Sequence, residues 1–245
     1  MSLRNILGVN VWAADGTLAF ERIRTAITEG RHERYAFLNA HGANLAHEDA
    51  SFRQLLADFV VLPDGAGVDI ASLWLHGRVF PANLNGTDLV PQFLRATARP
   101  IRVGLWGAAP GVAERAAQNW RTLFPQHRFD AIAHGFLGSA DRDRHLDALT
   151  REPVDLLLVA MGNPRQERFI VEHLNERHAR VVMGVGALLD FAAGRVPRAP
   201  SVLRRLRLEW IWRLGLEPRR MWRRYVLGNP LFLLRVSRQA KRSLG

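Results

Sequence analysis

Short runs of consecutive nonpolar residues alternate along the chain with amphipathic segments. The clearest run, residues 154–160, is followed by Met161-Gly-Asn-Pro164 and then by a helical pattern from about residue 166 to 177. Five further runs have the same character, at residues 35–39, 60–62, 101–106, 129–133 and 181–185. Uninterrupted nonpolar strands are typical of parallel sheets that helices cover on both faces. The sequence therefore predicts an α/β fold with a Rossmann-like, largely parallel sheet and helices on both faces.

The basic residues are concentrated at one end of the sequence. The 245 residues include 34 Lys and Arg against 23 Asp and Glu, a net charge of +11. Residues 1–195 carry 21 side chains of each sign, whereas residues 196–245 carry 13 basic side chains and two acidic ones. We interpret residues 1–195 as a neutral α/β catalytic body that folds by itself. Residues 196–245 are then a basic, helical appendage that associates with a membrane.

The appendage combines helical spacing with aromatic residues and arginines. Leu203, Leu206, Trp210 and Leu214 recur at the spacing that puts side chains on one nonpolar face of a helix. Arg204, Arg205 and Arg207 fall largely outside this face. Pro218 suits the first turn of a second helix, and Pro230 is predicted to end it, before a nonpolar cluster at residues 231–234. Three tryptophans, Trp210, Trp212 and Trp222, lie among the arginines. This mixture suits a bilayer interface with anionic lipid, and it also suits single-stranded nucleic acid.

Several classes of protein and site are excluded by what the sequence lacks. Without cysteine, the chain has no disulfides, thiolate metal sites or cysteine nucleophile. No run approaches the roughly 18 nonpolar residues of a membrane span, and no signal core follows the start, so we expect a cytoplasmic protein. The nine histidines show no metal-ligand spacing. Asp141-Arg-Asp143 matches a metal-binding DxD pattern, but it reads better as a helix N-terminus capped by Ser139.

Polar residues and glycines gather just after the predicted strands. They are Asn39, Asp64, Gly65, Gly107, Gly162, Asn163, Gly184 and Gly186. Because ligands of open α/β sheets bind beyond the carboxyl ends of the strands, these loops are expected to form one site. Asp64 would suit a general base that takes a proton from an incoming hydroxyl. An ordinary Asp-Gly turn is the alternative.

Two other loops are candidates for binding. The segment Gly107-Ala-Ala-Pro-Gly111 could hold a phosphate on helix N–H groups, although it lacks the full GxGxxG spacing and a Walker lysine. A tight strand–helix turn explains it equally well. Pro164 can begin a helix, which places Arg165 and Gln166 in the first turn at the ligand end of the sheet. A binding role and a structural role remain open for both, while Glu167 favours the helix dipole.

A series of motifs stands in the order found in a known family. The motifs are Pro63-Asp-Gly-Ala-Gly, Asn85-Gly-Thr-Asp-Leu, Gly107-Ala-Ala-Pro-Gly, His134-Gly-Phe, Gly162-Asn-Pro-Arg-Gln-Glu, Gly184-Val-Gly-Ala-Leu-Leu-Asp-Phe-Ala-Ala-Gly, Arg198-Ala-Pro, Leu208-Glu-Trp-Ile-Trp-Arg-Leu and Glu217-Pro-Arg-Arg. Together they resemble the WecG/TagA/CpsF family of bacterial glycosyltransferases, from about residue 5 to residue 230. The resemblance implies an inverting, metal-independent transferase without a cofactor. Such enzymes move a sugar from a UDP-sugar to an undecaprenyl-diphosphate-linked saccharide during synthesis of exopolysaccharide or another surface polymer.

The resemblance also implies roles for individual residues and partners. Asp64 matches the catalytic base and Asn39 an asparagine of the same site, so both are assigned to catalysis. The residues assigned to substrate binding are Asn83, Gly107, Asn163, Arg165, Gln166, Gly186, Arg213, Arg220 and Arg223. Arg213, Arg220 and Arg223, in the appendage, would lie near the diphosphate and supply the positive charge that a metal ion usually provides there. The expected partners are a UDP-sugar, a polyprenyl-diphosphate-linked acceptor, the anionic cytoplasmic surface of the inner membrane and a second copy of the chain, with no nucleic acid and no metal.

Two positions depart from the family pattern. Many members have Thr-Pro-Asn where this chain has Phe37-Leu-Asn39, and many have arginine where it has Asn83. N-acetylmannosamine, its uronic acid and glucose are donors within the family. Because an anionic sugar would favour a nearby cation, Asn83 favours a neutral hexose or N-acetylhexosamine as the donor.

Two other functions compete with this interpretation. A nucleotide-cofactor oxidoreductase of the NAD type would use a similar sheet, but the chain has no GxGxxG with an acidic residue about 20 positions later. A nucleic-acid-binding protein with a basic arm would bind RNA or DNA with a steep dependence on salt. The neutral body, with polar loops at its strand ends, argues against the second.

Overall fold

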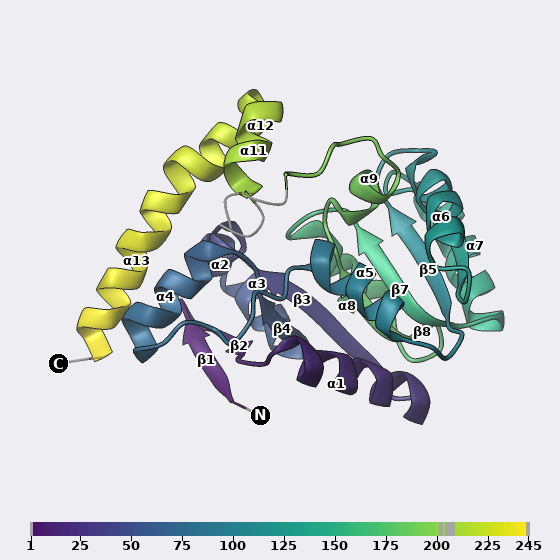
Figure 1. Cartoon of the computed structure of the whole chain (residues 1–245), viewed down its shortest axis with the longest axis horizontal. Helices are drawn as coiled ribbons and strands as arrows, with labels where there is room; N and C mark the ends of the chain where they lie inside the picture. The colour runs from purple at the N-terminus through teal and green to yellow at the C-terminus, as the bar shows by residue number, and fades with distance from the viewer. Residues whose placement is uncertain (1, 201–202, 204–208, 244–245) are drawn as a thin grey trace.

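A six-stranded parallel sheet forms the centre of the protein (Figure 1). The computed structural model describes residues 2–200, 203 and 209–243. The strands are β3 (Glu33–Leu38), β4 (Val60–Pro63), β5 (Arg102–Gly107), β6 (Arg128–Ala133), β7 (Val154–Ala160) and β8 (Ala179–Gly184). Their order across the sheet is β4-β3-β8-β7-β5-β6. The predicted parallel α/β fold is confirmed.

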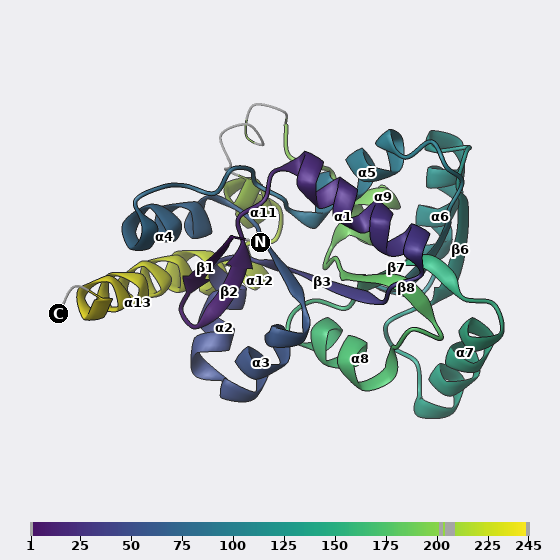
Figure 2. The same cartoon turned by 90° about the horizontal axis from the view of Figure 1, so that it is seen from below.

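Helices cover both faces of this sheet, as Figure 2 shows. One face carries α1 (Gly16–Glu29), α5 (Gly86–Ala96), α6 (Val112–Leu123) and α9 (Leu188–Ala192). The other carries α2 (Ala40–Glu48), α3 (Ala50–Leu55), the short 3₁₀ helix η1 (Leu56–Asp58), α7 (Ser139–Arg151) and α8 (Arg165–His173). Helix α4 (Ala66–His76) lies beyond the end of the sheet, against the N-terminal strand and the C-terminal helix, and its buried residues join the second core. Each face therefore has its own hydrophobic core.

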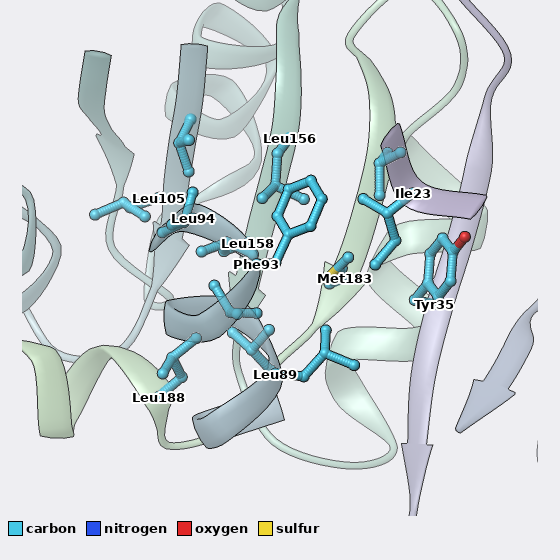
Figure 3. Close-up of a cluster of buried hydrophobic side chains, with 14 of the residues drawn as sticks. Ile23, Tyr35, Leu89, Phe93, Leu94, Leu105, Leu156, Leu158, Met183 and Leu188 are labelled. Carbon is cyan, nitrogen blue, oxygen red and sulfur yellow. The ribbon is translucent and has the colours of Figure 1, made fainter. Parts of the chain in front are cut away.

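The two cores explain the uninterrupted nonpolar strands. In β7, Leu156 and Leu158 point into the first core, whereas Leu157 and Val159 point into the second. Figure 3 shows the first core, where Phe93 of α5 lies among the leucines of β7. Because successive side chains of a strand point to opposite faces, a strand covered on both sides needs nonpolar residues at every position.

An antiparallel hairpin precedes the sheet and was not predicted. Strands β1 (Leu3–Ile6) and β2 (Val9–Trp12) pair through a turn at Leu7 and Gly8, both with positive φ. Ile6 and Val11 are fully buried in the second core. Polar residues interrupt the hairpin sequence, so its nonpolar signal is too short to stand out from a loop.

The C-terminal segment is helical, as expected. It contains α11 (Glu209–Leu216), α12 (Pro218–Trp222), the π-helix η2 (Arg223–Leu227) and α13 (Gly228–Ser243). Pro218 begins α12 as predicted, but the prediction that Pro230 ends a helix is wrong. Pro230 lies near the start of α13, which continues directly from η2: the Gly228 N–H donates to the Arg223 carbonyl. The wider π-turn changes the hydrogen-bond register just before Pro230, which lets the helical backbone continue past the missing proline N–H. Arg204, Arg205, Leu206 and Arg207 lie outside the described residues.

Helix α13 packs directly on the body. Phe232 and Val236 are fully buried in the second core. The backbone N–H of Leu7 donates to Gln239 Oε1 at 2.8 Å, and Asn44 Nδ2 donates to the Gly228 carbonyl at 2.8 Å. The boundary between residues 195 and 196 stays a prediction, but removing everything after it would uncover part of this core. Substitutions are therefore a sharper test of the appendage than truncation.

Within the described ranges of the chain, no helix is both long enough and nonpolar enough to span a bilayer.

Candidate active site

The register of β3 and β4 brings Asn39 and Asp64 together. Leu38 pairs with Pro63 in the parallel ladder, so the next residue of each strand leaves the sheet at the same edge. The backbone N–H of Asp64 continues the ladder by donating to the Leu38 carbonyl at 2.9 Å. Asn39 Nδ2 then donates to Asp64 Oδ2 at 3.0 Å. Two residues distant in sequence form one hydrogen-bonded pair at the carboxyl edge.

Helix α2 fixes the orientation of the Asn39 amide. Asn39 is the N-cap of this helix, and its Oδ1 accepts the backbone N–H of Gly42 at 3.1 Å. An N-cap oxygen satisfies a helix donor that has no other intrahelical partner. With the oxygen committed to the helix, the amide nitrogen has to face Asp64.

The loop after Asp64 is held by Asn83. Gly65 adopts a φ of 91°, a conformation that favours glycine, and its N–H donates to Asn83 Oδ1 at 2.8 Å. Asn83 was predicted to bind substrate, which stays a prediction, and its described contact supports the backbone beside Asp64. Its neighbour Gly86 lies against the Phe37 ring, which a side chain at Gly86 would approach to 3.0 Å. Of the two departures from the family pattern, Asn83 thus contacts the loop after Asp64, and Phe37 contacts Gly86, three residues after Asn83.

The environment of Asp64 suits a proton acceptor. Burial raises the pKa of the Asp64 carboxyl above its ordinary value, while the Asn39 hydrogen bond and the charges of Arg224 and Arg213 oppose that rise. The carboxylate of Asp88 acts in the same direction as burial. A raised pKa makes the carboxylate a stronger base, and the two cations keep its ionised form accessible.

The C-terminal helices place these two cations. The Arg213 guanidinium of α11 lies 5.7 Å from the ring centroid of Phe191. On the preceding residue, Trp212, the indole Nε1 donates to the Pro197 carbonyl at 3.1 Å. Arg224 of η2 lies 5.4 Å from the ring of Tyr225. Part of the C-terminal basic charge therefore reaches the electrostatic environment of Asp64.

The structure distinguishes among the appendage arginines. Arg213, which the resemblance implied, is one of the two cations that affect Asp64. Arg223 is exposed, with its guanidinium 5.5 Å from the Trp222 ring, and the Arg220 side chain lies outside the described part. Arg224 was not among the predicted site residues. The π-helix begins at Arg223 and has a wider turn than an α-helix. A regular α-helical spacing applied to the sequence therefore puts the residues after Arg223 on the wrong side of the helix.

A second group of predicted residues joins the loops after β7 and β8. The buried Gln166 accepts two backbone N–H groups on its Oε1, from Gly162 at 3.1 Å and Gly186 at 2.9 Å. Its Nε2 donates to Glu167 Oε1 at 2.7 Å, which Asn163 Nδ2 also contacts at 2.6 Å. Gln166 therefore ties two strand ends together, which is a positioning role.

Glu167 is a buried carboxyl that the sequence analysis assigned only to the helix dipole. The side chain is 0% exposed, and its Oε2 has no hydrogen-bond partner. Burial raises the pKa of Glu167 to about 7, against the lowering effect of its hydrogen bonds from Gln166 and Asn163. This carboxyl therefore gains and loses its proton close to neutral pH, within the network that supports the two loops.

Gly107 and Arg165 lie at the same edge of the sheet with different environments. Gly107 has a φ of 128°, and a Cβ there would lie 2.3 Å from the Ala160 carbonyl oxygen. Close packing of β5 on β7 accounts for this glycine without a ligand. Arg165 is exposed in the first turn of α8, where its guanidinium is accessible to solvent.

An ion pair connects the start of the appendage to α5. Arg198 donates to Asp88 Oδ1 at 2.6 Å, and Asn85 donates to the other oxygen, Oδ2, at 2.9 Å. Asp88 also influences the pKa of Asp64, so this pair belongs to the electrostatic surroundings of the base. Both residues lie within motifs noted in the sequence, but only the fold brings the motifs together.

The remaining titratable candidates contribute little charge to the site. Burial and the nearby Arg224 lower the pKa of His41 to about 4, which keeps it neutral. His134 Nδ1 accepts the Phe136 N–H at 3.2 Å. Asp141 and Asp143 are exposed in α7 and pair with Arg144 and Arg142, respectively. The predicted N-cap is wrong by one residue, because Gly138 and not Ser139 is the N-cap of this helix. In the described part of the chain, no three His, Asp or Glu side chains group as metal ligands would.

A cavity of about 650 Å³ lies at the opposite edge of the sheet. Its lining includes His32 and Glu33, at the amino end of β3, and Val60, at the amino end of β4. The residues around Asp64 do not contribute to it. The carboxyl edge, not this cavity, holds the predicted site residues.

Comparison with known families decides among the classes of function. Residues 4–244 match the family model described as "Glycosyl transferase WecG/TagA/CpsF family". The chain belongs to this family. A WecG/TagA/CpsF member is a glycosyltransferase, which agrees with the resemblance seen in the motifs and does not favour the oxidoreductase or nucleic-acid-binding alternatives.

Two curated relatives of this WecG/TagA/CpsF protein carry the same activity name. A protein of Bacillus spizizenii is 33% identical over 188 residues, which cover 76% of this chain and 71% of the relative. A protein of Staphylococcus aureus strain MRSA252 is 29% identical over 245 residues, covering 98% of this chain and 94% of the relative. Each is named an N-acetylglucosaminyldiphosphoundecaprenol N-acetyl-beta-D-mannosaminyltransferase.

Proposed function

We propose that the protein transfers a neutral hexose or N-acetylhexosamine from a UDP-sugar to a saccharide linked to undecaprenyl diphosphate, with inversion at the anomeric carbon. The observation that carries this proposal is the Asn39–Asp64 pair at the carboxyl edge, with the charges of Arg213 and Arg224 acting on it. The names of the relatives support the lipid-linked acceptor and an N-acetylhexosamine donor. Exopolysaccharide or another surface polymer is the expected product.

In the proposed reaction, Asp64 takes the proton from the acceptor hydroxyl as the hydroxyl oxygen bonds to the anomeric carbon. The bond to the UDP oxygen breaks, and its electron pair leaves with UDP. Arginines suit this step because the guanidinium fork binds phosphate oxygens with two hydrogen bonds and carries a permanent charge. We assign that task to Arg213 and Arg224 and expect no metal or cofactor to be needed.

Arg165, Asn163 and Gly186 are proposed to face the donor from the loops after β7 and β8. Arg165 is the exposed cation of that group, whereas Gln166 holds the loops in place. The acceptor lipid requires the protein to work at a membrane, and we propose the cytoplasmic face, where nucleotide sugars are available.

The test is transfer to a short-chain polyprenyl-diphosphate acceptor with a panel of UDP-sugars, in the presence and absence of a chelator. We expect transfer from a UDP-linked N-acetylhexosamine or hexose that persists in the chelator. Arg213→Ala and Arg224→Ala should lose most turnover, while Arg115→Ala, an exposed arginine on α6, should keep it. Selective transfer of a hexuronic acid, or stabilisation by NAD instead of UDP, would contradict the proposal.

A further inference from the structure

Helix α4 has an exposed nonpolar face. Ile70, Leu73 and Trp74 are 37%, 47% and 49% exposed, and their i, i+3, i+4 spacing puts them on one side of the helix. Val68 and Ala71, on the other side, are fully buried in the core. A helix already packed through one face has no folding reason to carry a second nonpolar face into solvent, and exposed patches of this kind mark contact surfaces.

This face lies beside helix α13. Both views place α4 and α13 side by side at one end of the molecule (Figures 1 and 2). Gly67, at the start of α4, faces Phe232 of α13 so closely that a side chain there would lie 3.6 Å from the ring. Leu231 and Leu234 of α13 are themselves 39% and 47% exposed. The α4–α13 surface, defined as Ile70, Leu73, Trp74, Leu231 and Leu234, thus draws on the body as well as on the C-terminal segment.

Exposed basic side chains predominate around the α4–α13 surface, where the exposed Glu48 of α2 is paired with Arg235 of α13. The sequence contains no Asp or Glu in residues 70–87 or in residues 218–245. Arg78, just after α4, and Arg238 and Lys241 of α13 are exposed. A second copy of the chain docked through the same face would bring these cations together, whereas an anionic lipid surface would complement them. Tryptophan beside exposed leucines is also typical of the bilayer interface.

We propose that α4 of the catalytic body inserts its nonpolar face into the interface of an anionic bilayer, alongside α13. Helix α4 begins at Ala66, two residues after Asp64. Seating α4 in the interface therefore fixes the position of the base relative to the membrane surface, where a lipid-linked acceptor would present its hydroxyl. Only this positioning of Asp64 rests on the proposed function, because the membrane contact itself does not depend on sugar transfer.

The absence of cysteine from the chain allows a direct test with the full-length protein. Leu73→Cys is labelled with a polarity-sensitive fluorophore, and Leu123→Cys serves as the matched control. Leu123 is a 64% exposed leucine at the end of α6, on the opposite side of the molecule from α4 in Figure 1. Each protein is mixed with vesicles of phosphatidylcholine, with and without phosphatidylglycerol, in the absence of donor and acceptor.

With phosphatidylglycerol vesicles, the label at position 73 should shift to the blue and be quenched by lipids that carry a quencher in the acyl chain. The label at position 123 should do neither. A label at position 73 that stays in water on vesicle-bound protein would overturn the proposal. A blue shift at position 73 that depends on protein concentration without vesicles would also overturn it, in favour of self-association.

Affinity gives an independent readout. Leu73→Gln combined with Trp74→Gln should weaken binding to phosphatidylglycerol vesicles by about tenfold or more, because two nonpolar side chains are then no longer transferred from water into the bilayer interface. Leu123→Gln should leave binding unchanged. Equal binding of all three proteins would contradict a role for α4. Because these assays contain no sugar donor, failure of the proposed transfer reaction would not affect their outcome.

Discussion

The amide nitrogen of Asn39 donates to Oδ2 of Asp64 at 3.0 Å, while the amide oxygen caps helix α2. One side chain therefore joins the base to the backbone of a helix that packs in the core. The hydrogen bond opposes the effect of burial on the pKa of Asp64.

Asn39→Ala should shift the pH dependence of transfer. Without the amide donor, the pKa of Asp64 rises further, so the acidic limb of the kcat/KM profile should move to higher pH. Loss of the cap should also cost about 1 kcal/mol of stability. Asp15→Ala is the control, because Asp15 caps α1 in the same way, with its carboxylate accepting the Leu18 N–H at 2.9 Å. A profile that moves equally in both variants would contradict the assignment.

Asp64→Asn should abolish turnover while UDP binding persists, because the amide accepts no proton. It should also change how stability depends on pH. Burial raises the folded-state pKa of Asp64, so the wild-type protein loses stability as pH rises from the unfolded-state pKa through the folded-state pKa. The variant lacks this loss and should have the higher melting temperature at neutral pH, with the difference shrinking in acid. Calorimetry across pH checks the sign, and a less stable variant at neutral pH would refute it.

Glu167→Gln should remove a fall in stability that the wild-type protein shows over a defined range of pH. The pKa of Glu167 is raised from 4.5 to about 7, so wild-type stability should fall as pH rises between these values and level off above them. Glutamine carries no titrating charge and should remove that fall. Glu172→Gln alters an exposed carboxylate on the same helix and should leave the curve as in the wild type. Denaturant unfolding at several pH values separates the two variants.

Gln166→Leu should loosen two loops at once. The variant leaves the partly buried N–H groups of Gly162 and Gly186 without their acceptor, which we expect to cost about 2 kcal/mol. Hydrogen exchange should then increase after both β7 and β8. Gln118→Leu, at an exposed position of α6, should change neither stability nor exchange. Exchange that increases after only one strand would show that Gln166 does not couple them.

Phe191→Leu should lower catalytic efficiency without unfolding the site. The Phe191 ring lies under the Arg213 guanidinium, and such contacts contribute roughly 0.5–1 kcal/mol at exposed sites. The expected loss in kcat/KM is therefore about two- to fivefold. Phe191→Tyr keeps the aromatic face and should restore activity. An equal loss in the two variants would point to packing instead of ring–cation contact.

Much of the site could be predicted from local sequence. Asn39 and Asp64 each follow a nonpolar run, and parallel strands end at one edge, so their proximity follows from the fold class. The roles of neighbouring residues could not be read in this way. Gln166 and Asn83 resemble substrate ligands by position, yet their described contacts hold backbone N–H groups. Whether a polar side chain meets a ligand or a loop depends on distances that sequence does not contain.

The sequence by itself determined the parallel sheet, because buried strands need nonpolar residues on both faces, and it located the basic charge at the C-terminal end. The tertiary structure decided how that charge is used. Within a π-helical turn, the charge of Arg224 acts on Asp64, whereas Arg223 stays exposed beside Trp222. Packing of Phe232 and Val236 makes α13 part of the body's core. These outcomes depend on side-chain packing between segments more than 150 residues apart, which local patterns do not encode.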